Sequence, residues 1–325
     1  MSVNGDIFVF DNIYLKLKTR IEIFWGRIWY LLSQSVKEFN HDHGTKLSAS
    51  LSYYTVFALP PLLIIIISLC SFFFGAEAVK GQIFSQINGL VGNTAARQIE
   101  ETIRNVSLSG DNRLTTILSV VVLLIGASGV FAEIQDSINF IWGIKAKPKR
   151  GFMKFLKNRL MSFSMIGSMG FLLLVSLIIN SLMDVFSHRL TTYLNKDVVF
   201  VIYTVNLIIV FIINTILFTV IFRTLPDGKI ALRDCFVGAS FTALLFMTGK
   251  FAIGAYLGSS MIATIYGAAG SVILILIWVY YSAIILYFGA EFTKVFALTH
   301  GQKIIPNNYS VLIIKQIEVE PASKT

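Results

Sequence analysis

Charged residues are scarce in this chain. They make up 14% of the 325 residues, while 55% are hydrophobic. Soluble domains typically contain about 25% charged and about 45–50% apolar residues. This deficit excludes a soluble globular domain for most of the chain, and it predicts a membrane domain with several spans.

Cysteine and histidine are also rare. The two cysteines, Cys70 and Cys235, lie in or beside apolar segments and form no CxxC pair, so they give no disulfide framework. The sequence has no GxSxG, HExxH or P-loop pattern. We therefore expect no enzyme: no catalytic residue, no metal site and no cofactor.

His41-Asp42-His43 forms the one cluster of histidines in the sequence. An H-x-H pair is a weak metal signal, and no third ligand is near in sequence. A solvated turn before the first membrane span is the favoured interpretation. The first 45 residues or so are mixed and charged, so we expect no cleavable signal peptide.

Long apolar runs dominate the rest of the chain and predict an all-α, polytopic membrane protein. A membrane helix needs about 20 apolar residues. Six runs meet that length, near 47–75, 114–143, 160–187, 198–222, 235–257 and 271–297. We divide the chain into an N-terminal segment at 1–45, a six-helix domain at 46–300 and a tail at 301–325.

The distribution of Lys and Arg predicts the orientation. Twenty of the 27 fall on one side if the loop KAKPKRGFMKFLKNR after the second span is cytoplasmic, and six fall on the other; Lys250 lies within the fifth span. Basic residues collect in cytoplasmic loops. Both termini are therefore expected in the cytoplasm. The net charge of +9 is explained by these loops and anionic lipids, so we expect no nucleic-acid partner.

Two connecting segments have helical periodicity. Apolar residues recur at helical spacing over 12–40, together with Trp25, Trp29 and Tyr30. This pattern is typical of an amphipathic helix on the cytoplasmic side, either lying on the inner leaflet or packed under the bundle. The outer connection, 76–113, suggests two short amphipathic helices.

The first span has an unusual build. Hydroxyl groups crowd its first half, including those of Ser52 and Tyr53, and Pro60-Pro61 interrupts its middle. Prolines free nearby carbonyls, which must find protein or water partners inside a membrane. The helix break at Pro60 and Pro61 therefore favours a span packed inside a bundle, where it could line a cavity.

Ionisable residues in or near the spans are the candidate site. Glu133, Gln135 and Asp136 follow the apolar part of the second span, at a depth similar to that of Ser52 and Tyr53. They predict either a polar vestibule open to the cytoplasm or an interfacial helix end whose acids pair with basic residues.

Lys250 lies within the fifth span and could snorkel outward, pair with Asp184 or face a cavity. Glycines in the same span, including Gly238 and the Gly254-x-x-x-Gly258 pair, predict close approach of another helix. Glu291 and Lys294 are expected to anchor the inner end of the sixth span.

Four stretches carry a resemblance to a known family. They are KLSASLSYYTVFALPPLL, GASGVFAEIQDSINFIWGI, FRTLPDGKIALRDCFVGASFTALLFMTGKFAIGAYL and YGAAGSVILILIWVYYSAIILYFGAEFTKVFA. In this order they resemble the YihY/BrkB family of bacterial inner-membrane proteins. The resemblance implies a six-helix inner-membrane domain with cytoplasmic ends. Members have also been labelled ribonucleases, but this sequence has no nuclease constellation.

Three functions follow as hypotheses. The first is a transporter or permease-like protein whose pathway is lined by Ser52, Tyr53, Glu133, Gln135, Asp136 and Lys250. Its partners would be membrane lipids and a small solute or ion. The second is an envelope scaffold or lipid-organising protein that transports nothing. A membrane-bound hydrolase ranks last, because no nucleophile–base pair or metal set is present.

Overall fold

The computed structural model describes residue 23 and residues 25–58, 97, 129–146, 196–259, 270–300, 303–307 and 310–313. Helices dominate this part of the chain. Shorter helices cover 25–41, 44–58 and 129–141, and three long helices are α7 (Lys196–Thr224), α8 (Leu232–Ser259) and α10 (Gly270–Thr299).

The three long helices contain stretches suited to crossing a membrane. These are Thr204–Thr224, Leu232–Gly254 and Val272–Thr299, with 21, 23 and 28 residues. About 20 apolar residues span a bilayer core. The predicted spans at 198–222, 235–257 and 271–297 are thus confirmed as long apolar helices.

The other three predicted spans are only partly covered. Residues 47–58 and 129–141 are helical, as predicted for the start of the first span and the end of the second. Residues 59–75, which include Pro60-Pro61, residues 114–128 and the whole of 160–187 lie outside the described residues. So does the outer connection 76–113, apart from Arg97.

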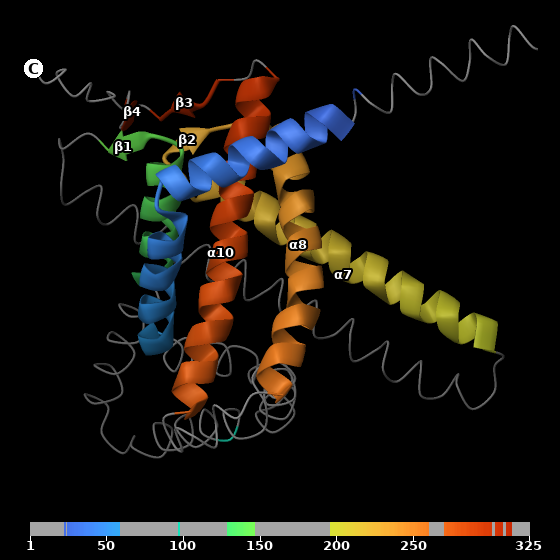
Figure 1. The fold of residues 1–325 in the computed structure, drawn as a ribbon. Helices are drawn as coiled ribbons and strands as arrows, with labels where there is room; N and C mark the ends of the chain where they lie inside the picture. Colours follow the sequence, from blue (N-terminus) through green and yellow to red (C-terminus); the bar gives the residue numbers. More distant parts are fainter. Residues whose placement is uncertain are drawn as a thin grey trace, which may run out of the picture.

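The long helices pack through α8, which contacts both α7 and α10. In Figure 1, α8 and α10 stand beside each other, while α7 leaves them at a steep angle. The helix at 25–41 crosses one end of α10, where the rings of Phe39 and Phe288 meet edge to face with centroids 5.8 Å apart.

Small residues bring α8 and α10 together. A Cβ atom added at Gly238 of α8 would collide with Thr293 of α10, and one added at Gly289 of α10 would collide with Thr242 of α8. Both threonine hydroxyls donate to carbonyls of their own helix, Thr242 to Gly238 and Thr293 to Gly289, each at 2.7 Å. The interface is therefore close and leaves neither hydroxyl unsatisfied. Gly254, by contrast, has nothing within 4 Å of an added Cβ.

Four short strands complete one end of the bundle, called the strand end below. β1 (Ile144–Ala146) pairs antiparallel with β4 (Ser310–Leu312), and β2 (Gly228–Lys229) pairs antiparallel with β3 (Ile305–Pro306). The all-α prediction missed them, because two or three residues are too few to show strand periodicity. Part of the predicted tail at 301–325 is consequently bound to the membrane domain.

The buried core also lies at the strand end. It joins the last residues of α7, the first half of α8 and the second half of α10 to β1 and to the shorter helices at 25–41, 44–58 and 129–141; its fully buried members include Ile138, Phe222, Cys235 and Tyr287. Toward the other end, apolar side chains such as Ile208, Ile212 and Phe251 are exposed. Exposed apolar faces of this kind suit contact with lipid.

Candidate functional site

Lys294 is the centre of a buried group of charges at the strand end. Its Nζ atom lies 2.9 Å from Oε2 of Glu291, 3.1 Å from Oε2 of Glu38 and 3.3 Å from Oδ2 of Asp42. We call these four residues the Lys294 cluster. It is a four-membered ion network rather than a simple surface pair.

Local helix geometry explains how two elements supply the cluster. Glu291 and Lys294 are separated by three residues on α10, a spacing that puts side chains on one helix face. Glu38 and Asp42 are four residues apart, and Asp42 N donates to Glu38 O at 2.8 Å. His43 then adopts a left-handed φ of 53° and ends the helix at 25–41. Both acids are thereby held against α10.

A third element is tied in by a backbone contact. Lys294 Nζ donates to the carbonyl oxygen of Ile141 at 2.9 Å. Ile141 is at the end of the helix at 129–141, where carbonyls lack partners within the helix. A cation there also interacts favourably with the negative end of the helix dipole. Lys294 therefore fastens three segments together.

Burial makes the cluster energetically demanding. The Asp42 and Glu291 side chains are fully buried, while Lys294 is 11% and Glu38 32% exposed. Removing charges from water is expensive unless they are paired and hydrogen-bonded. Asp42 also lies 2.9 Å from Nδ1 of the largely exposed His41. Oε2 of Glu291 is paired with Lys294, whereas Oε1 has no hydrogen-bond partner among the described residues.

Asp227 forms a second polar network close to β2. Its Oδ1 and Oδ2 accept from Gln135 Nε2 at 3.1 Å and Asn139 Nδ2 at 3.2 Å, and its backbone N donates to Asn139 Oδ1 at 2.7 Å. Its carbonyl accepts from the Ser310 hydroxyl at 2.6 Å and from Asn307 N at 2.9 Å. This network joins the second predicted span, the loop after α7 and the C-terminal strands. Its evident role is to hold the strand end together.

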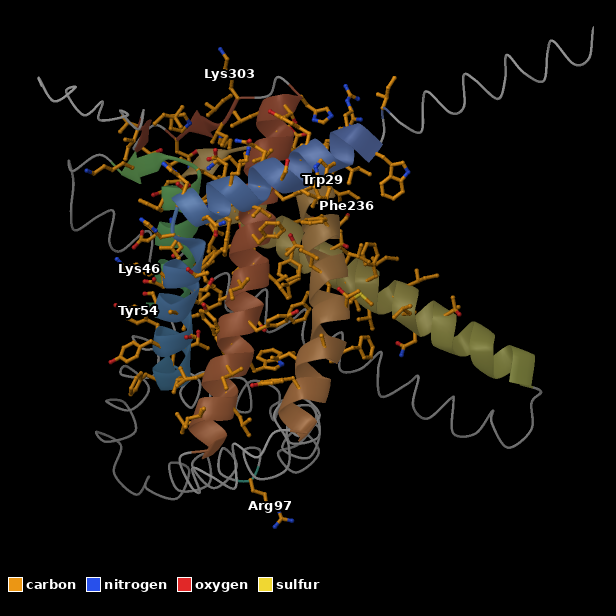
Figure 2. The ribbon with its side chains drawn as sticks, in the orientation of Figure 1. Trp29, Lys46, Tyr54, Arg97, Phe236 and Lys303 are labelled. Carbon is orange, nitrogen blue, oxygen red and sulfur yellow. The ribbon has the colours of Figure 1, made fainter. Side chains whose placement is uncertain are left out.

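An open cleft of about 1220 Å³ lies beside the Lys294 cluster. Its polar lining includes Glu38, His41, Lys294 and Lys303. Its apolar lining comes from the segment just before β1, from the end of α10 and from the strands after α10, including Trp142, Ile304 and Leu312. Figure 2 shows Lys303 projecting from this end of the molecule. The cluster is thus reachable from the strand end.

The structure separates most of the residues predicted from the sequence. Tyr53 is 60% exposed, Ser52 is buried and donates to Ala49 O at 2.9 Å, and Lys250 is exposed on α8. None of the three lines the cleft described above. Their role in a pathway stays a prediction, as does the helix break at Pro60 and Pro61, which falls outside the described residues.

The polar patch of the second span divides in the same way. Gln135 belongs to the Asp227 network. Glu133 is half-buried and Asp136 is exposed, and neither lines the cleft. The structure therefore brings Gln135, but not Glu133 or Asp136, into one of the two networks described above.

Sequence reasoning missed the Lys294 cluster although it noticed all its parts except Glu38. Glu291 and Lys294 were expected to be interfacial anchors, and Asp42 to lie in a solvated turn. The turn is present, and His41 and His43 are exposed, but Asp42 is completely buried. The i,i+3 acid–lysine pair inside an apolar run was the one available signal. Its partner lies 252 residues away, beyond any local pattern.

Long apolar helices, lipid-suited outer faces and charge gathered at one end define a helical membrane protein. The chain belongs to the virulence factor BrkB family, whose model matches residues 35–308. This finding confirms the family resemblance drawn from the four sequence stretches.

Relatives named UPF0761 membrane protein are similar over most of the chain. The one from Saccharophagus degradans is 25% identical over 283 residues, which are 87% of this chain and 63% of the relative. The one from Azotobacter vinelandii is 28% identical over 267 residues, 78% of this chain and 60% of the relative. One from Vibrio vulnificus is 26% identical over 293 residues, 88% and 87% of the two chains.

The first two of these relatives are therefore considerably longer than the part that this chain matches. Their names describe them as membrane proteins and give no substrate. No solved structure matches the chain significantly.

Proposed function

We propose that the chain is a transporter or permease-like protein of the bacterial inner membrane, and not an enzyme. Six spans would cross the bilayer, with the strand end and both termini in the cytoplasm. The excess of Lys and Arg in the segments assigned to that side supports this orientation. A small solute or ion would be the transported species, and membrane lipids would surround the domain.

One observation carries the proposal: the open cleft at the strand end, with the buried Lys294 cluster in its wall. Buried charges in a membrane domain are costly and usually mark substrate or ion pathways. The cleft would be the cytoplasm-facing vestibule that the sequence predicted, lined by other residues than expected.

The helix at 25–41 would lie at the inner-leaflet surface in this arrangement. Its Trp25, Trp29 and Tyr30 side chains are 64%, 73% and 56% exposed. Trp and Tyr favour the membrane–water interface, where an apolar body and a polar tip are both accommodated. Its opposite face, which carries Ser35 and Phe39, is buried. The sequence offered two alternatives for this helix, lying on the inner leaflet or packing under the bundle. In this arrangement its aromatic face would lie on the leaflet and its opposite face would pack against the bundle.

Reconstituted vesicles test the transport proposal. Purified protein is placed in vesicles that enclose a pH-sensitive dye, and proton flux is followed after a pH jump, with and without gradients of Na⁺ or K⁺. Wild-type vesicles should dissipate the gradient faster than protein-free vesicles. Glu291→Gln should abolish the difference, because it removes a charge from the cluster.

Glu133→Gln is the matched control, because Glu133 is half-buried and lies outside the cluster. The flux through this variant distinguishes the pathway predicted from the sequence from one through the cleft. Loss of flux would show that Glu133 belongs to the pathway. Wild-type flux equal to that of protein-free vesicles under all gradients would contradict proton- or alkali-ion-coupled transport.

A scaffold or lipid-organising protein is the second candidate. The exposed aromatic face of the helix at 25–41 favours it, because such a face can perturb or recruit headgroups without any transport. Absence of flux in the vesicle experiment would shift the conclusion to this alternative.

A further inference from the structure

Negative charge is in excess in the Lys294 cluster. Three carboxylates surround one ammonium group, so the formal charge is −2 when His41 is neutral. Uncompensated charge that is withdrawn from water costs several kcal/mol. Asp42 and Glu291 are nevertheless completely buried. The charge balance therefore favours a cation of higher charge than the lysine ammonium among these three acids.

Glu291 provides an independent indication of a ligand. Its side chain is fully buried, and its carboxylate is directed into the cluster, within 4.8 Å of ligand atoms of Glu38 and Asp42. Its Oε2 is paired with the Lys294 ammonium at 2.9 Å, but its Oε1 accepts no hydrogen bond in the described part of the protein. Buried carboxylate oxygens normally have hydrogen-bond partners. A directly bound cation would satisfy Oε1.

The spacing and chemistry of the donors select the kind of cation. One carboxylate oxygen from each of Glu38, Asp42 and Glu291 lies within 4.8 Å of the others. Oxygens bound to a Ca²⁺ ion at roughly 2.3–2.6 Å are at most about 5 Å apart, and those around smaller divalent ions somewhat less. An all-oxygen set suits Mg²⁺, Mn²⁺ or Ca²⁺ rather than soft metals.

In this structure the Lys294 ammonium occupies the position between the three acids, and the adjoining cleft provides space into which the lysine side chain could move. Its ammonium lies within 3.3 Å of all three acids, yet its side chain also lines the open cleft. A divalent ion would neutralise the carboxylates better than a single positive charge. The flexible lysine side chain could then turn toward the cleft while the ion binds the acids.

We propose that the Lys294 cluster is a binding site for one hard divalent cation, which enters through the cleft and exchanges with the Lys294 ammonium. Glu38, Asp42 and Glu291 are its ligands. The site is independent of whether the protein transports anything, because binding is an equilibrium property of the cluster.

Mn²⁺ is the probe for the test, since its spin resonance signal distinguishes free from bound ion. Detergent-purified wild-type protein should bind one Mn²⁺ per chain, in competition with Mg²⁺ or Ca²⁺. Glu291→Gln and Glu38→Gln should each weaken binding by at least about tenfold, since even changes in the residues that merely support metal ligands typically cost roughly 10–100-fold.

Glu133→Gln should bind Mn²⁺ as the wild type does, because Glu133 is outside the cluster. If Glu291→Gln does not fold, Glu38→Gln still decides the test, because Glu38 is partly exposed on the helix at 25–41 and its substitution should disturb folding less. No Mn²⁺ binding by wild type, or equal binding by wild type and Glu38→Gln, would overturn the proposal. Binding without flux in vesicles would support the cation site and contradict only the transport function.

Discussion

At the scale of single residues, Lys294 has more partners than any other described side chain discussed above. Its ammonium contacts carboxylates from two helices and donates a hydrogen bond to the carbonyl of Ile141, at the end of a third helix. The cost of desolvation largely offsets the attraction within a buried ion network, so its net stabilisation is small. Removing one partner is still strongly destabilising, because it leaves buried charge unpaired.

Lys294→Met should therefore lower the free energy of unfolding by about 3–5 kcal/mol, because it leaves buried carboxylates without their ammonium partner. Thermal or denaturant unfolding of the detergent-solubilised protein measures the loss. Lys250→Met is the matched control: this lysine is exposed, has no ion pair in the described part of the chain, and should change stability by less than about 0.5 kcal/mol. If the two substitutions lowered the free energy of unfolding equally, Lys294 would have no special structural role.

At the scale of elements, the close contact between α8 and α10 includes two glycines that each face a threonine of the other helix. Gly238 and Gly289 allow an approach that any Cβ atom would prevent. The sequence favoured glycine-mediated packing in this span but placed emphasis on Gly254-x-x-x-Gly258. Gly254 in fact has open space around it. The spacing of glycines along a helix can be read from a sequence, but which of them face the neighbouring helix cannot.

Gly238→Ala should lower the free energy of unfolding by about 1–3 kcal/mol, because the new methyl group collides with Thr293 and forces the helices apart. Gly254→Ala makes the same chemical change in the same helix without a neighbour to strike. It should leave stability unchanged or raise it by up to about 1 kcal/mol through helix propensity. The comparison requires only unfolding curves of the two variants, and a larger loss for Gly254→Ala would show that the interface has been misplaced.

At the scale of the whole molecule, sequence length and hydropathy predicted more than local chemistry did. The three long helices α7, α8 and α10 match predicted spans because a run of apolar residues is itself the cause of membrane insertion. The Lys294 cluster and the Asp227 network were not predicted, because Asp42 meets Lys294 and Asn139 meets Asp227 only after the helices have packed. Gln135, which the sequence predicted for a pathway, takes part in that packing, and its role in a pathway stays a prediction.

The orientation of the molecule can be tested at two labelled positions. Figure 2 places Lys303 at the strand end and Arg97 at the opposite end, and both are exposed. In a variant without Cys70 and Cys235, Lys303→Cys should react with an impermeant maleimide only when the cytoplasmic side is accessible. Arg97→Cys should react in intact spheroplasts. The reverse pattern would invert the proposed topology.

The strand pairs have a further consequence for the order in which the protein is completed. β1 and β2 precede their partners β4 and β3 in the chain by long stretches that include α8 and α10. Until the residues after α10 have been synthesised, the carbonyls of Gly143 and Asp227 lack the Ile313 and Asn307 amides that donate to them. Strands β3 and β4 can therefore pair only after α10 has been made, and a chain truncated after α10 would leave β1 and β2 without their partners.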